Sequence, residues 1–375
     1  MKNNRTFLEK LLDGAEVEWK PLKDILIRTK GTKITAAEMK VLHKDNAPLK
    51  IFAGGKTFAL VNFEDIPEKD INKNPSIIVK SRGIIEFEYY DKPFSHKNEM
   101  WSYYSNDKNI NIKYIYYVLK NQESYFQNLG SKMQMPQIAI PDTDKYLVPI
   151  PPLPVQTKIV KILDALTALT SELTSELILR QKQYEYYREK LLSFDSLEQL
   201  NSGGGEKKLI DVCINIFSGK NKERNDNGLY PIYGSTGIIG KTNKKEFSNE
   251  QILVARVGAN AGYVHIAKGE YDVSDNTLIV QNNENIDLKF LYHTLVNIKL
   301  NQYAKGAGQP LITAGQLKSM EINVPSLEEQ QRIVSILDKF ETLTNSITEG
   351  LPLAIEQSQK RYEYYRELLL NFHNP

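Results

Sequence analysis

The chain has 375 residues, of which 41% are hydrophobic and 25% are charged, as in an ordinary globular protein with room for two cores. It has no apolar run near 18 residues, and its first residues lack the apolar core of a secretion signal, so we expect a cytoplasmic protein without a membrane span. The lone Cys213 fits a reducing compartment. A formal net charge of +2 does not identify a nucleic-acid binder, although such a balance can conceal local basic loops.

Residues 1–16 are expected to form a helical segment, and residues 17–151 have the pattern of a first mixed α/β domain. Short runs of Val, Ile, Tyr and Phe, broken by Gly, Asn, Asp and Pro, predict strands and turns with few helices. Ile77–Gly83 is predicted to be a strand that ends in a polar loop, and Lys113–Leu119 a short helix.

Residues 152–200 predict one long helix, because apolar residues recur at spacings of three and four along Gln156–Phe194. At about 1.5 Å per residue this segment would span roughly 60 Å, far more than a domain of this size needs. Its apolar stripe must therefore pack against a partner. The tetrapeptide Thr-Ser-Glu-Leu occurs twice in tandem, at 170–173 and 174–177, and each unit adds about 6 Å of helix.

Residues 201–325 predict a second domain, which follows a flexible linker at Ser202-Gly-Gly-Gly205. The segment 252–258 matches 77–83 in pattern, and 289–295 matches 113–119. Little sequence is shared between these landmarks. We therefore expect one scaffold with two different surfaces.

Residues 326–375 predict a second long helix, and it duplicates the first. The segment 358–372, SQKRYEYYRELLLNF, repeats 180–194, RQKQYEYYREKLLSF, with eleven of fifteen positions identical. Upstream, QQRIVSILD at 330–338 repeats QTKIVKILD at 156–164. A period of about half the chain is far longer than the 20 to 50 residues of solenoid repeats. The duplication predicts two copies of one module with pseudo-twofold symmetry.

The two helices carry matching apolar stripes, which favours an antiparallel coiled coil. The second copy is four residues longer between its threonine and glutamine landmarks, and Gly350 and Pro352 in that region predict a kink or an interruption. The expected fold class is therefore α+β, with two mixed α/β domains joined by two long helices packed as an antiparallel coiled coil.

The sequence offers no catalytic or metal-binding motif. An adenine methyltransferase needs an Asn/Asp-Pro-Pro-aromatic loop, but Ile150-Pro-Pro-Leu153 lacks both the polar and the aromatic residue. Gly54-Gly-Lys-Thr57 is similar to the end of a phosphate-binding loop, but Lys50 stands where that motif needs glycine. The five histidines show no zinc-ligand spacing. We expect no catalytic residue and no bound metal.

Polar loops are the remaining candidates for function. Arg and Lys can bond guanine, Asn and Gln can bond adenine, and glycines let the backbone approach phosphates. Any single loop is better explained as a solvated turn, but recurrence at corresponding places in both domains favours DNA binding for the set. The candidates in the first domain are Gly54, Gly55, Lys56, Thr57, Lys80, Ser81, Arg82, Lys132, Gln134 and Gln137. Those in the second domain are Tyr233, Ser235, Thr236, Lys241, Arg256, Asn260, Lys305 and Gln309.

The repeated YEYYRE motif has more aromatic rings than one helical stripe can bury. We expect its outer faces to bind partner proteins, although packing between the two helices explains any one tyrosine equally well. The predicted partner-binding residues are Tyr184, Tyr186, Tyr187, Arg188, Tyr362, Tyr364, Tyr365 and Arg366.

These duplicated motifs, the Thr-Ser-Glu-Leu tandem and Phe7-Leu-Glu-Lys-Leu-Leu-Asp13 resemble the specificity subunit of type I restriction-modification enzymes over nearly the whole chain. The resemblance implies two target-recognition domains that each read half of a split double-stranded DNA site, and helices that set the gap. It implies two methyltransferase (modification) subunits that bring S-adenosylmethionine. In a restriction complex it implies two motor-nuclease subunits that use ATP with magnesium. The chain itself would bind no cofactor.

Two other classes of function remain open. A scaffold protein that joins other proteins without reading DNA would show no salt-dependent binding to duplexes. A stand-alone DNA methyltransferase with an unrecognised site would bind S-adenosylmethionine by itself.

Overall fold

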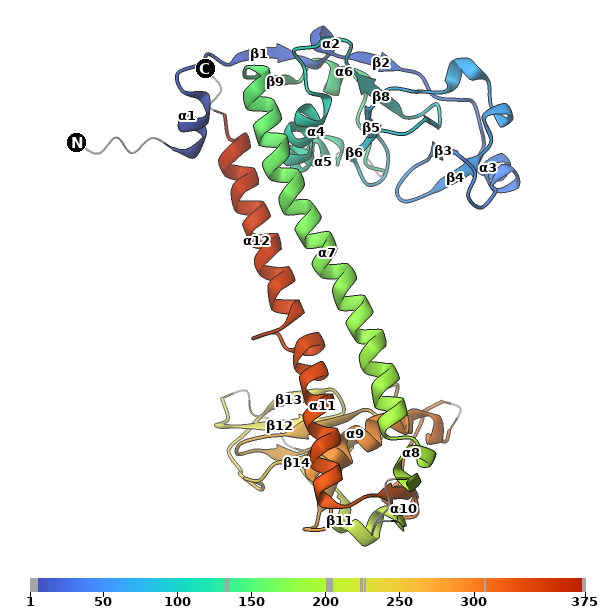
Figure 1. The fold of residues 1–375 in the computed structure, drawn as a ribbon, viewed down its shortest axis with the longest axis vertical. Coiled ribbons are helices and arrows are strands. Elements are labelled where there is room, and N and C mark those ends of the chain that lie inside the picture. Colours follow the sequence, from blue (N-terminus) through green and yellow to red (C-terminus); the bar gives the residue numbers. More distant parts are fainter. Residues whose placement is uncertain are drawn as a thin grey trace, which may run out of the picture. The chain divides into compact units, whose positions relative to one another are not determined.

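A computed structural model describes residues 6–131, 135–199, 205–222, 225, 227–306 and 308–372. The chain divides into two compact units (Figure 1). Unit 1 comprises Met1–Glu172 and Glu356–Pro375, and unit 2 comprises Leu173–Ile355. Each unit therefore combines one domain with parts of both long helical segments.

Unit 1 contains three small sheets. The first pairs β1 (Glu18–Pro21) with β9 (Leu147–Ile150). The second has the strand order β2 (Ile27–Thr29), β8 (Trp101–Tyr104), β5 (Ser76–Lys80) and β6 (Glu86–Tyr90). The third has the order β4 (Phe58–Val61), β3 (Leu49–Phe52) and β7 (Phe94–His96).

Unit 2 repeats all three sheets in the same strand order. The first pairs β10 (Gly205–Lys208) with β18 (Glu321–Val324). The second is β11 (Cys213–Ser218), β17 (Thr277–Asn282), β14 (Gln251–Ala255) and β15 (Val264–Ala267). The third is β13 (Gly237–Thr242), β12 (Tyr230–Gly234) and β16 (Asp272–Val273). In both three-stranded sheets the central strand has one antiparallel and one parallel neighbour, so the expected duplication extends to topology.

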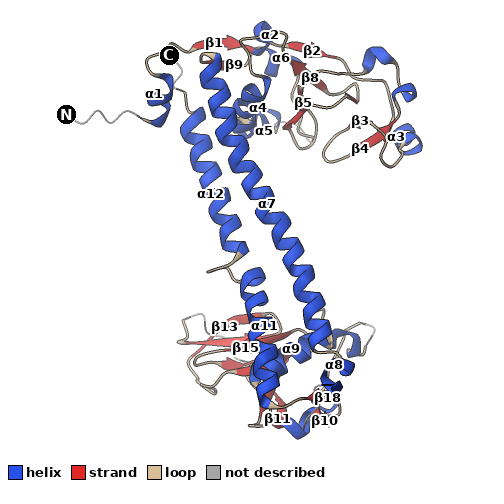
Figure 2. Cartoon of the chain, viewed as in Figure 1, coloured by secondary structure: helices blue, strands red, loops and turns tan. Residues whose placement is uncertain are grey.

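Short helices complete the two domains (Figure 2). Those of unit 1 are α1 (Phe7–Leu12), α2 (Leu22–Ile25), α3 (Ala36–Leu42), α4 (Ile112–Asn121), α5 (Glu123–Gly130) and α6 (Ile140–Asp144). Those of unit 2 are α8 (Phe194–Gln199), α9 (Leu288–Asn297) and α10 (Ala314–Lys318). Helices α4 and α9 are the predicted matched pair. Each starts at an N-cap, Asn111 or Asp287, whose side chain accepts hydrogen bonds from two backbone amides of the first turn.

The first long helix is continuous and the second is not. Helix α7 runs over Leu153–Leu191 and so ends shortly before the predicted Phe194. The second copy consists of α11 (Leu327–Asn345) and α12 (Leu351–Leu370), and it breaks where Gly350 and Pro352 predicted an interruption. Gly350 has a φ of +84°, and a Cβ there would lie 2.5 Å from the carbonyl oxygen of Thr342. No helix among the described residues is long and apolar enough to cross a bilayer.

In unit 1 the first turns of α7 pack against the last turns of α12. Ile159 and Leu163 share a buried core with Leu369, and this core continues into the domain. Further along, Thr170 Oγ1 lies 2.8 Å from Ser358 Oγ. The two helices therefore run antiparallel within this unit, as expected from their stripes.

In unit 2 the second long segment contributes its beginning to the core and the first long segment contributes its end, which is the reverse of unit 1. The first turns of α11 contribute Ile333 and Leu337 to the domain core, together with Tyr184 from the end of α7. The rings of Tyr184 and Tyr187 stack on Phe340 with centroid distances of 6.3 and 5.5 Å. Each domain core thus includes the beginning of one long segment and the end of the other.

A buried glutamine fastens each long segment to its domain. The side-chain oxygen of Gln156 accepts a hydrogen bond from the Asn111 backbone amide at 2.9 Å, and its amide donates to the Pro151 carbonyl at 2.8 Å. Gln330 makes matching bonds, at 2.7 Å to the N-cap residue of α9 and at 2.9 Å to the proline before α11. Both glutamines are 0% exposed. The first residue of the QxxIVxILD motif is therefore a structural anchor between two helices.

We expect Gln156→Ala and Gln330→Ala each to lower the free energy of unfolding of their own unit by about 2–4 kcal/mol, because buried backbone groups lose their partners. Urea denaturation with circular dichroism measures the loss. Gln181→Ala on the exposed face of α7 is the control and should change stability by less than about 0.5 kcal/mol. Equal effects at positions 156 and 181 would contradict the anchor role.

Candidate nucleic-acid interface

In unit 1, backbone and side-chain hydrogen bonds join four loops into one surface. We call it the unit 1 loop surface, and it consists of residues 53–57, 81–83, 97–99 and 136–138. Lys97 N donates to Phe52 O at 2.9 Å, which holds the turn between β3 and β4 against the third of these loops. Ser81 Oγ donates to Glu99 O at 2.6 Å and links that loop to the end of β5. Separate candidate loops of the sequence thus become neighbours.

Two loops of this surface, residues 81–83 and 136–138, are bridged to each other. Arg82 and Gln137 form an antiparallel bridge, and Gly83 N donates to Pro136 O at 2.9 Å. Gly83 turns the chain with a φ of +74°. Residues directly opposite each other in an antiparallel bridge have side chains on the same face. The fold therefore places two predicted DNA-binding side chains, Arg82 and Gln137, together.

Unit 2 builds the same surface from corresponding loops. We call it the unit 2 loop surface, and it consists of residues 233–237, 256–258, 274–276 and 310–312. Ser274 N donates to Tyr233 O at 2.9 Å, and Arg256 N donates to Asn276 O at 2.9 Å. These bonds correspond in place to the two links made by loop 97–99 in unit 1. Ser235 Oγ adds a bond to Asn276 O at 3.3 Å.

The bridge is repeated as well, with different side chains. Val257 and Leu311 form the antiparallel bridge, and Gly258 N donates to Pro310 O at 3.0 Å. Gly258 has a φ of +83°, close to that of its counterpart in unit 1. An apolar pair thus occupies the place of the polar pair.

Two of the predicted DNA-binding residues of unit 1 are buried. Lys80 is 5% exposed, and its ammonium group pairs with Glu86 at 2.6 Å and Glu88 at 2.8 Å. Burial acts to lower the pKa of Lys80, but the two carboxylates outweigh it and hold the pKa above its ordinary value. Ser81 is 2% exposed and bonds within the protein. Both residues are suited to support the surface from beneath.

The other candidates of unit 1 divide into those on the surface and those not described. Gly54, Lys56, Thr57 and Arg82 are exposed, while Gly55 and Gln137 are half-buried. Lys132 and Gln134 lie outside the described residues.

In unit 2 the candidates lie on or beside the loop surface, with one exception. Thr236, Asn260, Lys305 and Gln309 are exposed, and Tyr233, Ser235 and Arg256 are half-buried. Lys305 is tied to the surface because its backbone exchanges hydrogen bonds of 3.0 and 2.9 Å with Leu311. Lys241 is also exposed, but it pairs with Pro231 along β13 and is not part of these loops.

Tyr233 packs within unit 2 and has limited freedom. Its ring stacks on the His265 ring at a centroid distance of 5.8 Å, and the Tyr263 ring stacks on the same histidine at 5.7 Å. Burial lowers the pKa of His265 to about 4, so this histidine is neutral at physiological pH. The stack stiffens the end of β12 that leads into the loop surface.

The loops that connect the candidates, residues 97–99 and 274–276, were not predicted from the sequence. Lys97 forms an ion pair with Glu99 at 2.6 Å, whereas Asp275 of the equivalent loop lies 3.9 Å from Lys222. These loops share no sequence signal, because their role is carried by backbone groups. Only the parallel pairing of β7 and β16 with the central strands could have indicated their position.

The YEYYRE motif adopts one arrangement in both units. Its first tyrosine is turned inward, and burial raises the pKa of Tyr184 to about 12. The second tyrosine points outward, with Tyr186 58% and Tyr364 61% exposed. Tyr186 and Tyr364 each make an edge contact with the next tyrosine at 5.4 Å. The motif thus divides into packing and exposed positions.

The arginine of the motif stands over the first tyrosine in both units. Arg188 lies 5.0 Å from the ring centre of Tyr184, and Arg366 lies 5.7 Å from that of Tyr362. The Nε atoms of both arginines are buried without a hydrogen-bond partner among the described residues. The remaining tyrosines, Tyr187 and Tyr365, are half-buried.

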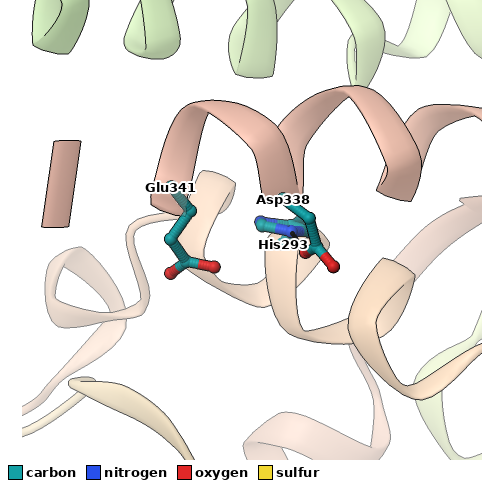
Figure 3. A group of neighbouring side chains, drawn as sticks. All are labelled: His293, Asp338 and Glu341. Carbon is teal, nitrogen blue, oxygen red and sulfur yellow. Dashed lines mark hydrogen bonds and ion pairs between the residues drawn. The ribbon is translucent and has the colours of Figure 1, made fainter. Parts of the chain in front are cut away.

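A polar cluster joins α9 to α11 in unit 2 (Figure 3). The His293 Nε2 lies 3.0 Å from Asp338 Oδ1, and the same aspartate pairs with Lys289. Tyr292 OH donates to Glu341 at 2.8 Å. The ligand atoms of His293, Asp338 and Glu341 lie within 4.8 Å of one another, but each group already has a protein partner. The cluster is therefore explained as a clip between two helices.

Unit 1 has the same clip with a different central residue. Lys113 pairs with Asp164 at 2.8 Å, and Tyr117 OH donates to Asp164 at 2.5 Å. Tyrosine thus stands in unit 1 where histidine stands in unit 2. The first unit lacks a group that titrates near neutral pH at this point.

This difference predicts that unit 2 loses stability as the pH falls below about 6.5. Burial lowers the pKa of His293 and outweighs the opposing pull of Asp338. The unfolded chain, with an ordinary histidine pKa of about 6.5, then binds more protons than the folded chain, so acid favours unfolding. Hydrogen exchange corrected for intrinsic rates should show α9 losing protection between pH 7.5 and 5.5 while α4 changes less. If His293→Gln leaves this pH dependence intact, the assignment is wrong.

The chain is similar to known type I restriction-modification specificity subunits. The family "Type I restriction modification DNA specificity domain" matches this chain twice, over residues 15–180 and over residues 202–357. The chain is 40% identical to a Haemophilus influenzae protein named as a type I restriction enzyme specificity subunit, over 99% of this chain and 100% of the relative. It is 35% identical to the EcoR124I/EcoR124II specificity subunit of Escherichia coli, over 99% of this chain and 98% of the relative.

Solved structures have the same fold. The crystal structure of a type I restriction-modification S subunit from M. genitalium matches with a TM-score of 0.66 at 18% identity. The match covers 96% of this chain and 98% of that chain. The two domains and the long helices are therefore a shared architecture.

Proposed function

Because this chain belongs to the family of type I restriction-modification DNA specificity subunits, we propose that its two domains each read one half of a split double-stranded DNA site. The chain is the non-catalytic specificity component of such a system. The duplicated loop surface supports the proposal most strongly. The same hydrogen-bonded loops carry different side chains in the two units, which suits a protein that reads two different half-sites.

The proposed target-recognition domains are residues 17–151 and 201–325. The proposed spacer segments are residues 152–200 and 326–375, and residues 1–16 precede the first domain. The spacer segments would set the gap between half-sites. One Thr-Ser-Glu-Leu unit adds about 6 Å of helix, which corresponds to about one or two base pairs at 3.4 Å each.

The proposed DNA contacts are the accessible candidates of the two loop surfaces. Basic and small residues at the turns suit phosphates, and the bridged positions suit base edges. The contacts in unit 1 are Gly54, Gly55, Lys56, Thr57, Arg82 and Gln137, and those in unit 2 are Tyr233, Ser235, Thr236, Arg256, Asn260, Lys305 and Gln309. Lys241 is a separate candidate for a phosphate contact on β13.

The proposed partners are two modification subunits that bring S-adenosylmethionine. In a restriction complex, two motor-nuclease subunits that use ATP with magnesium would join them. A net charge of +2 is small for a protein that holds a duplex alone, so partners would supply much of the phosphate neutralisation. Such a complex acts on cellular DNA in the cytoplasm.

Mapping methylated adenines tests the function directly. Cells that express this chain with the modification subunit of the same system should gain methylation at one split motif. Cells that express either protein alone should not, because catalysis and recognition would reside on different chains. A soluble complex that adds no methylation would contradict the proposal.

Two further measurements separate the alternatives. Binding of the complex to a duplex should weaken steeply between 50 and 200 mM salt, whereas a scaffold protein would show no such dependence. A stand-alone methyltransferase would bind S-adenosylmethionine as the purified chain, and we expect no such binding.

The exposed tyrosines predict where the modification subunits dock. Tyr186→Ala combined with Tyr364→Ala should weaken co-purification with the modification subunit at least about tenfold, because exposed tyrosines at interface centres often contribute more than 1 kcal/mol each. Stability should change little, since both side chains project into solvent. Lys182→Ala combined with Lys360→Ala, on exposed positions of the same repeats, is the matched control. Equal loss of binding in both double variants would refute the docking role.

A further inference from the structure

The two loop surfaces differ most clearly at one pair of equivalent positions. Arg82 and Gln137 form the bridge in unit 1, and Val257 and Leu311 form it in unit 2. We propose that this bridged pair determines which base pair each unit selects at one position of its half-site. Arg82 and Gln137 read a purine, whereas Val257 and Leu311 contact the methyl group of thymine. This inference rests on the proposed function and names the chemistry of its recognition.

The equivalence of these positions follows from the backbone. In unit 1 the bridge is flanked by bonds of 2.9 Å from Gly83 N to Pro136 O and 3.0 Å from Ile138 N to Ser81 O. In unit 2 the corresponding bonds, from Gly258 and Ile312, are 3.0 and 2.8 Å. Each bridge follows a buried inner strand of the four-stranded sheet, β5 in unit 1 or β14 in unit 2. A glycine with positive φ comes directly after each bridge. The scaffold is the same, so the side chains carry the difference.

The polar pair has the chemistry needed to read a purine. Arg82 is exposed and forms no ion pair within 4 Å among the described residues, so its guanidinium donors are accessible. Arginine bonds the O6 and N7 acceptors of guanine, and glutamine bonds N6 and N7 of adenine. Gln137 stands opposite Arg82 on the same face, so both can address one base edge.

The apolar pair cannot donate hydrogen bonds to a purine. Valine and leucine side chains instead suit the thymine methyl group, the apolar feature of the major groove. The nearby Arg256 does not replace Arg82, because it precedes the bridged position and its Nη1 lies 3.5 Å from both Ser218 Oγ and the Asp275 carbonyl oxygen. Unit 2 therefore presents a hydrophobic contact where unit 1 presents donors.

Exchanging the pairs tests the inference. One variant combines Arg82→Val with Gln137→Leu, and the reciprocal variant combines Val257→Arg with Leu311→Gln. Each full-length chain is co-expressed with its modification subunit, and methylated adenines are mapped. In each variant we expect the base preference to change by about tenfold or more at one position of one half-site. The other half-site and the spacer, read by unchanged residues, are the internal control.

A second measurement covers variants that bind DNA but methylate poorly. The purified complex selects duplexes from a pool with one half-site randomised, and the retained duplexes are sequenced. Loss of the wild-type base at one position, with the other half-site still selected, supports the inference. Retention of the wild-type preference in both halves overturns it. Failure of the wild-type complex to select any split site overturns the proposed function, and the inference with it.

Discussion

The attachment of each long helical segment to a domain depends on one buried amide. Gln156 and Gln330 accept the backbone N–H of a helix N-cap and donate to a proline carbonyl at the point where the long segment begins. A glutamine can do both because its side chain carries an acceptor and a donor on one rigid group. The amide therefore fixes the direction in which the long helix leaves the domain. Any function that uses the helices to place the domains depends on this direction.

Apart from this anchor, the two units share their backbone interactions and differ in their side chains. The strand orders, the bridged loops and the clip between the short and long helices are the same in both units. At the clip, unit 1 has a tyrosine where unit 2 has a histidine. At the bridge, unit 1 has a polar pair where unit 2 has an apolar pair. Backbone hydrogen bonds do not depend on side-chain identity, so surface residues can diverge without loss of the fold. This separation suits a protein that must recognise two different sequences.

The repeated YEYYRE motif illustrates how one short sequence serves two purposes. Its first tyrosine packs on the domain and lies under the arginine, while its second tyrosine remains in solvent. Aromatic residues left exposed at equivalent places in two repeats are consistent with contacts to another protein. The interior of the fold and the proposed docking surface are therefore parts of one helix.

The sequence by itself determined the features that arise from local periodicity and repetition. The long helix α7, the break at Gly350, the short helices α4 and α9 and the duplication could all be predicted, because helical spacing, glycine and repeated motifs act over neighbouring residues. Tertiary structure decided the rest. From the sequence, Lys80 was predicted to be a basic loop residue, but it is buried and pairs with two carboxylates of the next strand. Arg82 lies beside Gln137 only because two distant loops are bridged. The bridge joins residues far apart in the chain through backbone hydrogen bonds, which leave no pattern in the side chains.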